Sequence, residues 1–184
     1  CSRLNVIPAR APGRERIVRA MKTHTFEASQ WVPTPVGQTF DFFADAANLE
    51  AITPSFLNFR ILTPLPIEMR KGARIDYWLR LDGLPVRWRT EITTWEPGRA
   101  FVDTQLRGPY AKWVHLHTFE SEAGGTRLRD RVEYALPLDP LSRPMHGLYV
   151  RPAVERIFRH RRVVIARLLG EDTSAERETA GHSV

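Results

Sequence analysis

The chain has 184 residues, 42% of them hydrophobic, and a formal net charge of +6. This length and apolar content suit one globular domain with its own core. No apolar run approaches the roughly 20 residues that a membrane-spanning helix requires. The only cysteine, Cys1, excludes an internal disulfide framework and fits a reducing compartment, so we expect a cytoplasmic protein.

The basic residues are mostly arginines dispersed along predicted strands, which is typical of a solvated surface. The sequence contains no glycine-rich phosphate loop, zinc-knuckle spacing or aromatic RNA-binding signature. We therefore predict no nucleic-acid partner.

The two ends differ in composition from the middle. Residues 1–21 combine arginines with prolines, which is typical of a flexible extension. Because Met21 directly precedes the first strand, we expect residues 1–20 to be an over-extended reading rather than a lipidated terminus. Residues 171–184 are acidic and lack an apolar pattern, so we predict a disordered tail. The ligand-binding domain is then expected at 22–170.

The ordered part begins with alternating residues 23–32, which predict a strand. Residues 34–46 follow with apolar side chains at helical spacing, with Thr34 as the candidate N-cap and Pro35 at the first helical position. A second short helix is predicted at 48–52, since the residue before Pro54 avoids helical geometry.

From residue 59 onward, apolar residues recur at every second position, which is the spacing of a β-strand. Six further strands are predicted at 59–62, 74–81, 86–95, 100–107, 112–120 and 126–136. Glycine and proline turns separate most of them, so the connections are short and an antiparallel meander is expected. An amphipathic helix follows at about 150–169, with its apolar stripe toward the sheet and a basic run at 159–162. The pattern predicts an α+β helix-grip fold, in which a curved seven-stranded antiparallel sheet wraps around the long C-terminal helix.

Several stretches carry a family resemblance: FDFFADAANLEAITP, LPVRWRTEIT, FVDTQLRGPY, WVHLHTF and DRVEYALP. The chain resembles the SRPBCC ligand-binding superfamily, which includes START-like, birch-pollen-allergen-like, polyketide cyclase/dehydrase, lipid-transport and coenzyme Q-binding proteins. It is most similar to bacterial members, over about residues 22–169. The resemblance implies a deep cavity between the sheet and the last helix, with a small hydrophobic molecule or lipid as the partner. Because members differ in activity, the fold alone does not decide the function.

The stretch WVHLHTF at 113–119 places two histidines and two large aromatic residues on one face of a strand. The next strand fixes which face this is, because its arginines and Glu133 must face water and Asp130 must then face inward. We therefore predict that both histidines face the core side of the sheet. A slip of one residue would turn them outward.

Turn lengths also predict which residues lie opposite one another. On one side of the histidine strand the expected pairs are Gln105–His115, Asp103–His117 and Phe101–Phe119, and on the other side His117–Asp130 and Trp113–Tyr134. His117 would then lie in a cross-strand row between two carboxylates. Buried polar groups of this kind make sense beside a cavity in which they orient a ligand. We predict that ten residues line it: Trp88, Phe101, Asp103, Gln105, Trp113, His115, His117, Phe119, Asp130 and Tyr134.

These residues favour binding of a hydrophobic molecule with one polar end, such as a quinone, an acyl chain or a polyketide-like aromatic, without a cofactor. One alternative is a cyclase/dehydrase-type enzyme, because Asp103 and Asp130 could tune His117 for acid–base catalysis. Another is an interaction protein that uses the basic run 159–162 at a peripheral membrane site or partner. The two histidines and two carboxylates could also ligate a metal, but this spacing is a weak signal and we predict none. The sequence makes no prediction of oligomeric state.

Overall fold

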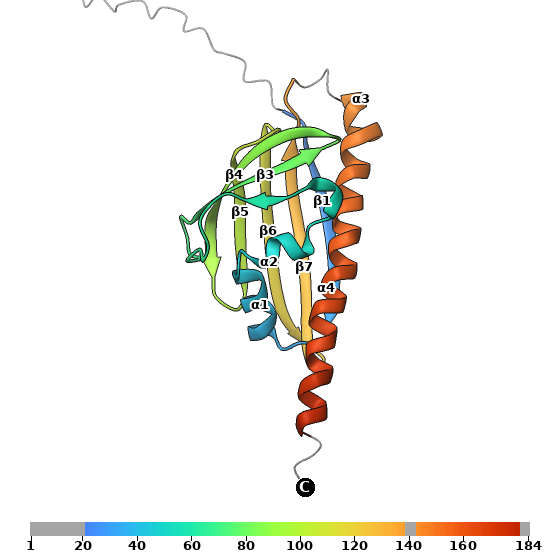
Figure 1. The fold of residues 1–184 in the computed structure, drawn as a ribbon. Coiled ribbons are helices and arrows are strands. Elements are labelled where there is room, and N and C mark those ends of the chain that lie inside the picture. Colours follow the sequence, from blue (N-terminus) through green and yellow to red (C-terminus); the bar gives the residue numbers. More distant parts are fainter. Residues whose placement is uncertain (1–20, 139–142, 181–184) are drawn as a thin grey trace, which may run out of the picture.

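The structure, a computed structural model, describes residues 21–138 and 143–180. Seven antiparallel strands form one curved sheet in the order β1-β7-β6-β5-β4-β3-β2, and the long helix α4 runs beside it (Figure 1). The strands are β1 Thr23–Val32, β2 Arg60–Ile61, β3 Arg74–Leu81, β4 Leu84–Glu96, β5 Ala100–Arg107, β6 Lys112–Glu122 and β7 Gly125–Ala135. The helices are α1 Val36–Ala44, α2 Asn48–Ile52, α3 Arg143–Met145 and α4 Arg151–Ala180, with a 3₁₀ turn η1 at Ser55–Leu57 and a π-helical turn η2 at His146–Val150. The predicted α+β helix-grip fold is confirmed.

The ends of the last helix differ from the prediction of 150–169. Helical structure begins earlier, in α3 and η2, and α4 continues to Ala180. The sequence has no proline or glycine between residues 171 and 180 that would end a helix. The segments 1–20 and 181–184 lie outside the described residues.

The predicted N-cap of the first helix is wrong. Pro35 occupies the cap position, and the helix makes no side-chain cap hydrogen bond. The Thr34 hydroxyl instead donates a hydrogen bond to the backbone carbonyl of Leu169 on α4. Its own carbonyl accepts hydrogen bonds from the hydroxyls of Thr39 and Thr126. Thr34 therefore connects the start of α1 to the end of the buried stripe of α4. A contact between residues so far apart in the chain cannot be predicted from the local sequence around Thr34.

Helix α4 covers the sheet with the apolar stripe that its spacing predicts. Val154, Phe158, Ile165 and Leu169 are buried, at intervals of four and seven residues that keep one face toward the core. This face contacts β1 and α2. No helix in the described part of the chain is both long and apolar enough to cross a membrane.

Candidate functional site

A cavity of about 180 Å³ lies between the inner face of the sheet and the helices α1, α2 and α4. Most of its wall is apolar, including Phe43, Leu49, Leu57, Phe59, Met69, Ile75, Leu79, Ile92, Val154, Ile157 and Phe158. Engineered apolar cavities of about 150 Å³ take up a benzene ring, so this space suits one aromatic ring or a short chain. Its polar wall comprises Tyr77, Thr90, Asp103, Tyr110, His115, His117 and Arg161.

Six of the ten residues predicted to line the cavity do so. They are Trp88, Phe101, Asp103, Trp113, His115 and His117. Both histidines are buried, at 5% exposure each, and they face inward as the alternation predicts. The structure therefore agrees with the sequence on which side chains of β6 face inward.

The other four predicted residues do not border the cavity. Phe119 packs in the core, with its ring centroid 5.3 Å from that of Phe40. Tyr134 lies beside Trp113, and its hydroxyl is 2.9 Å from His146 Nε2. Asp130 lies behind the histidines, and Gln105 turns toward the loop that follows it. These four residues face the core side of the sheet or the loop at its end, but other side chains separate them from the cavity.

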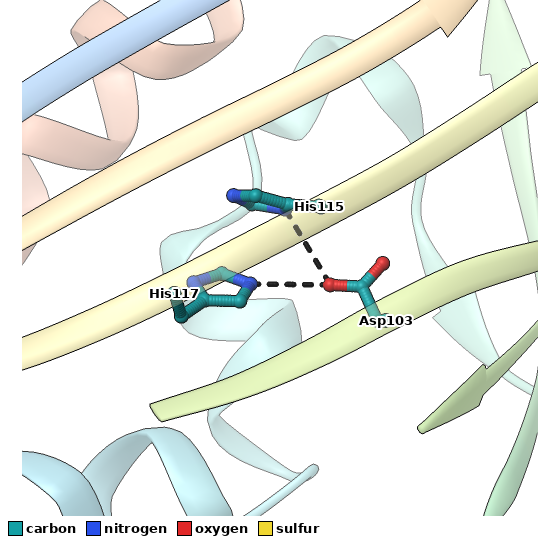
Figure 2. A group of neighbouring side chains, drawn as sticks. All are labelled: Asp103, His115 and His117. Atoms are coloured by element: carbon teal, nitrogen blue, oxygen red, sulfur yellow. Dashed lines mark hydrogen bonds and ion pairs between the residues drawn. The ribbon is translucent and has the colours of Figure 1, made fainter. Parts of the chain in front are cut away.

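One side of the polar wall rests on a cluster of side chains from three neighbouring strands. His115 and His117 project from β6 with ring centroids 3.7 Å apart, and both reach Asp103 on β5 (Figure 2). Asp103 Oδ2 is 3.1 Å from His117 Nε2 and 3.5 Å from His115 Nδ1. On the far side, Asp130 Oδ1 from β7 is 3.0 Å from His117 Nδ1 and 2.9 Å from His115 Nε2. We call these four residues the His–Asp cluster.

The register between β5 and β6 differs from the prediction by two residues. Asp103 lies opposite His115, and Phe101 lies opposite His117 and stacks on its ring at 4.3 Å. Asp103 still reaches His117, because diagonal neighbours on one face of a sheet lie within reach. The pairing of β6 with β7 is as predicted, with His117 opposite Asp130.

The register differs because the β5–β6 connection closes through a side chain. Gln105 Nε2 donates a hydrogen bond of 2.7 Å to the carbonyl of Tyr110, and Gln105 Oε1 accepts one of 3.4 Å from the Tyr110 amide. The strand ladder therefore stops at the pair Thr104–Val114, short of the pair predicted from loop length. A Cβ at Gly108 would lie 2.3 Å from Gln105 Oε1, so a larger residue here would displace the Gln105 side chain.

The cluster has four short nitrogen–oxygen contacts. The protonation states of the two histidines determine which of these contacts are hydrogen bonds. Burial lowers the pKa of His117, but the hydrogen bonds to Asp103 and Asp130 together raise it by more than burial lowers it. The net result is a pKa above the ordinary value. Burial and the charge of His117 hold the pKa of His115 below its ordinary value, despite its hydrogen bond to Asp130. His117 is then the imidazolium and donates to both carboxylates. Neutral His115 donates from Nε2 to Asp130, and its Nδ1 lone pair faces Asp103 across the longest of the four contacts.

Both carboxylates stay ionised in this arrangement. Burial raises the pKa of Asp103, but the hydrogen bond to His117 and the nearby histidine charges lower it more, to below its ordinary value. The same balance lowers the pKa of Asp130 far below its ordinary value, since both histidines hydrogen-bond to it. Burial raises the pKa of Tyr77 well above its ordinary value, so this tyrosine presents a neutral hydroxyl to the cavity.

Three members of the cluster could hold a metal ion. Asp103, His115 and His117 each offer one ligand atom, all within 4.8 Å of one another. A divalent cation there would replace the Nε2 proton of His117 and take the lone pair of His115 Nδ1. Asp130 would then accept one N–H from each ring, as carboxylates commonly do behind metal-bound histidines. A proton and a cation would therefore compete for the same position.

The protonation states give a testable prediction. At pH 6.5, the ordinary histidine pKa, we expect His117 to carry protons on both ring nitrogens in most molecules, whereas His115 is mostly neutral with its proton on Nε2. Long-range nitrogen–proton NMR correlations of the imidazole rings would distinguish these states. A histidine in an unstructured peptide serves as the reference for the ordinary value. Two mostly neutral rings at pH 6.5 would contradict the assigned charge.

Arg161 lines the cavity but is not among the residues predicted to do so. Its place in the basic run 159–162 suggests an outward side chain, yet the stripe of α4 passes through Phe158, Arg161 and Ile165 at helical spacing. The helical spacing of three residues from Phe158 and four residues to Ile165 would have predicted that Arg161 faces the core. Because Arg161 turns inward, the basic run is not a continuous outward patch, which weakens the membrane or partner alternative.

Several solved structures resemble this fold at low sequence identity. Protein CV1439 from Chromobacterium violaceum has a TM-score of 0.62 and 14% identity, over 79% of this chain and 96% of that chain. The major latex-like protein 151 from Panax ginseng has a TM-score of 0.58 and 11% identity, over 80% of this chain and 97% of that chain. The di-domain ARO/CYC StfQ from the steffimycin biosynthetic pathway has a TM-score of 0.62 and 16% identity, over 83% of this chain and 52% of that chain. At these identities the likeness concerns the fold alone.

Among curated proteins, none matches the sequence. A protein family does match it: the family described as polyketide cyclase / dehydrase and lipid transport covers residues 23–165. That range contains all seven strands and α4 as far as Ile165, and thus both walls of the cavity. The chain therefore belongs to the polyketide cyclase / dehydrase and lipid-transport family, within the SRPBCC superfamily.

Proposed function

We propose that the protein binds a small apolar molecule that carries oxygen at one end. The observation that supports this is the cavity itself: its wall is mostly aromatic and aliphatic, and its carboxylate, imidazole and guanidinium groups come from Asp103, His115, His117 and Arg161. Such sites bury the apolar body of a ligand and orient it through a few polar groups. Membership of a family named for cyclases and lipid transport supports the same role.

The size and lining of the cavity favour an aromatic ligand. A space of about 180 Å³ holds one ring, and the walls include Phe101, Trp88 and Trp113. A quinone head or a polyketide-like aromatic has this shape and carries ring oxygens. An acyl chain is the third ligand class, and a long one would require α4 to move away from the sheet.

Two matched probes test this proposal: acetophenone, an aromatic ketone, and ethylbenzene, a hydrocarbon of similar shape. We expect both to bind and to shift the ring resonances of His115 and His117 in an NMR titration. His117→Gln should weaken acetophenone binding several-fold more than ethylbenzene binding, because only the ketone interacts with the polar wall.

Thr118→Ala provides the control, because Thr118 lies on the opposite face of β6 from the histidines. This variant should leave both affinities unchanged. An effect of Thr118→Ala with unshifted histidine resonances would contradict binding in the cavity.

A second function, catalysis of the cyclase/dehydrase type, is supported by one observation. His117 borders the cavity and sits between two carboxylates that raise its pKa above the ordinary value, so it stays protonated to higher pH than a free histidine, beside any bound carbonyl. A proton donor with a pKa near the working pH is suited to general acid catalysis. Turnover of a polyketide-like substrate that is lost in His117→Gln, with binding retained, would favour the enzyme over the carrier.

A further inference from the structure

Two buried side-chain atoms in the described part of the chain have no hydrogen-bond partner: Trp88 Nε1 and Arg161 Nε. Both are donors, and both belong to residues that line the cavity. Native proteins leave few buried polar groups unpaired, and each exception calls for a specific reason. Their occurrence at one cavity indicates that the missing partners belong to a ligand.

Arg161 differs from the paired arginines on the outside of the sheet. Arg89 and Arg127, for example, each form an ion pair with a carboxylate, whereas Arg161 has none with any described residue. Its guanidinium carbon lies 5.6 Å from the ring centroid of Phe158, so an aromatic ring supports the group. The nearby carboxylate of Asp103 is already hydrogen-bonded to His117. A full positive charge therefore remains at the cavity wall without a direct counter-ion.

Arg161 also stands at the edge of the cavity. Together with Phe158 it borders a second, outer groove between β1 and α4. A ligand group bound to Arg161 would thus lie where the cavity approaches solvent, while the rest of the ligand lies among the apolar walls. This is the orientation in which an amphipathic molecule loses the least hydration.

Trp88 supplies the second donor from deeper within the sheet. Its side chain is on β4, 6% exposed, and its ring lies 5.4 Å from that of Trp113. An indole N–H can donate but cannot accept a hydrogen bond, so only an acceptor atom satisfies it. A carbonyl, ether or phenol oxygen on the ligand would do so.

Resting on the proposed function, we propose that the ligand is a small aromatic carboxylic acid, whose carboxylate binds Arg161 and whose second oxygen accepts a hydrogen bond from Trp88. The planar guanidinium matches a carboxylate better than any other common anionic group except phosphate. The single-ring size of the cavity and its aromatic wall favour a carboxylate attached to a ring. The predicted ligand class is therefore narrower than a hydrophobic molecule with a polar end.

The test compares 4-acetylbenzoate with acetophenone, which has the same ring and ketone but lacks the carboxylate. Isothermal titration calorimetry should show that the wild-type protein binds 4-acetylbenzoate at least about tenfold more tightly. Arg161→Met, which keeps the aliphatic stem but removes the guanidinium, should abolish this preference, because 4-acetylbenzoate loses its counter-charge and acetophenone has no charge to pair. Trp88→Phe, which removes the indole N–H while keeping an aromatic ring, should weaken both probes several-fold.

Arg162→Met is the matched control, since Arg162 is the next residue on α4 and is exposed. It should preserve the preference for 4-acetylbenzoate. Equal affinity of the wild type for the two probes would overturn the carboxylate assignment while leaving the proposed function intact. Failure of acetophenone, ethylbenzene and 4-acetylbenzoate to bind would overturn both. Thermal unfolding of each variant establishes that it is folded before binding is measured.

Discussion

Replacing Asp130 by asparagine should lower the free energy of unfolding at pH 6 by about 3–5 kcal/mol, the usual cost of removing one partner from a buried ion pair. Asp130 accepts hydrogen bonds from both His115 and His117 and carries one of the two negative charges that hold the His117 imidazolium. Without the Asp130 carboxylate, the His117 imidazolium either stays buried beside Asp103 alone or loses its proton. In the second case it also loses its charge interaction with Asp103. Urea unfolding followed by circular dichroism measures the difference.

The cost of Asp130→Asn should depend on pH in a defined direction. The pKa of His117 is raised in the folded protein, so its stabilising contribution is fully present below the ordinary value of 6.5 and is lost as pH rises through the folded pKa. The difference between wild type and variant should therefore be smaller at pH 9 than at pH 6. A cost that increases with pH would contradict a charged His117.

The control for Asp130→Asn is Glu133→Gln on the same strand. Glu133 faces the other side of β7 and pairs with Lys112 at 2.8 Å, with about a third of each side chain exposed. Surface pairs of this kind contribute at most about 1 kcal/mol, so this variant should be mild. Similar losses in the two variants would mean that the His–Asp cluster is no more important for stability than a surface pair.

Replacing Phe158 by alanine should lower the free energy of unfolding by about 3–5 kcal/mol, the range for buried phenylalanines. Phe158 is 7% exposed and packs from α4 against the sheet. Its ring centroid is 4.6 Å from that of Phe26 on β1 and 5.4 Å from that of His115 on β6. Truncation would leave a void at the contact between helix and sheet. Chemical unfolding at pH 7 gives the value.

Val163→Ala is the matched control for the helix. Val163 lies on α4 and is 66% exposed, so its truncation should change stability by less than about 0.5 kcal/mol. If Phe158→Ala and Val163→Ala had equal effects, the apolar stripe of α4 would not be the surface that contacts the sheet.

The sequence predicts best what depends on local periodicity. Alternation along residues 113–119 assigns His115 and His117 to the inner face, and the turn before β7 places His117 opposite Asp130. The β5–β6 register could not be predicted from loop length, because it depends on how the connection folds, and here the Gln105 side chain hydrogen-bonds to the backbone of Tyr110. A shift of two residues preserves the face but changes the partner. This is why Asp103 belongs to the cluster as predicted but lies opposite His115.

The size and exact lining of the cavity could not be predicted from the sequence, because they depend on the distance between α4 and the sheet. Phe119 and Tyr134 face the core side as alternation requires, but neighbouring rings cover them. Arg161 shows the opposite error, since its charge suggested an outward position although helical spacing places it on the apolar stripe. Inward orientation and access to a cavity are separate properties, and periodicity reports only the first.

The order of strands in the sheet also has a consequence for how the protein folds. Strands β2 to β7 pair with their neighbours along the chain, whereas β1 joins β7 across roughly a hundred residues, which costs more loop entropy. The meander is thus expected to form before β1 and α4 close over it. The His–Asp cluster lies on three successive strands of the meander, so it belongs to the part that folds early. The wall that encloses the cavity belongs to the part that folds late, and local unfolding of that wall would open the cavity while the cluster stays assembled.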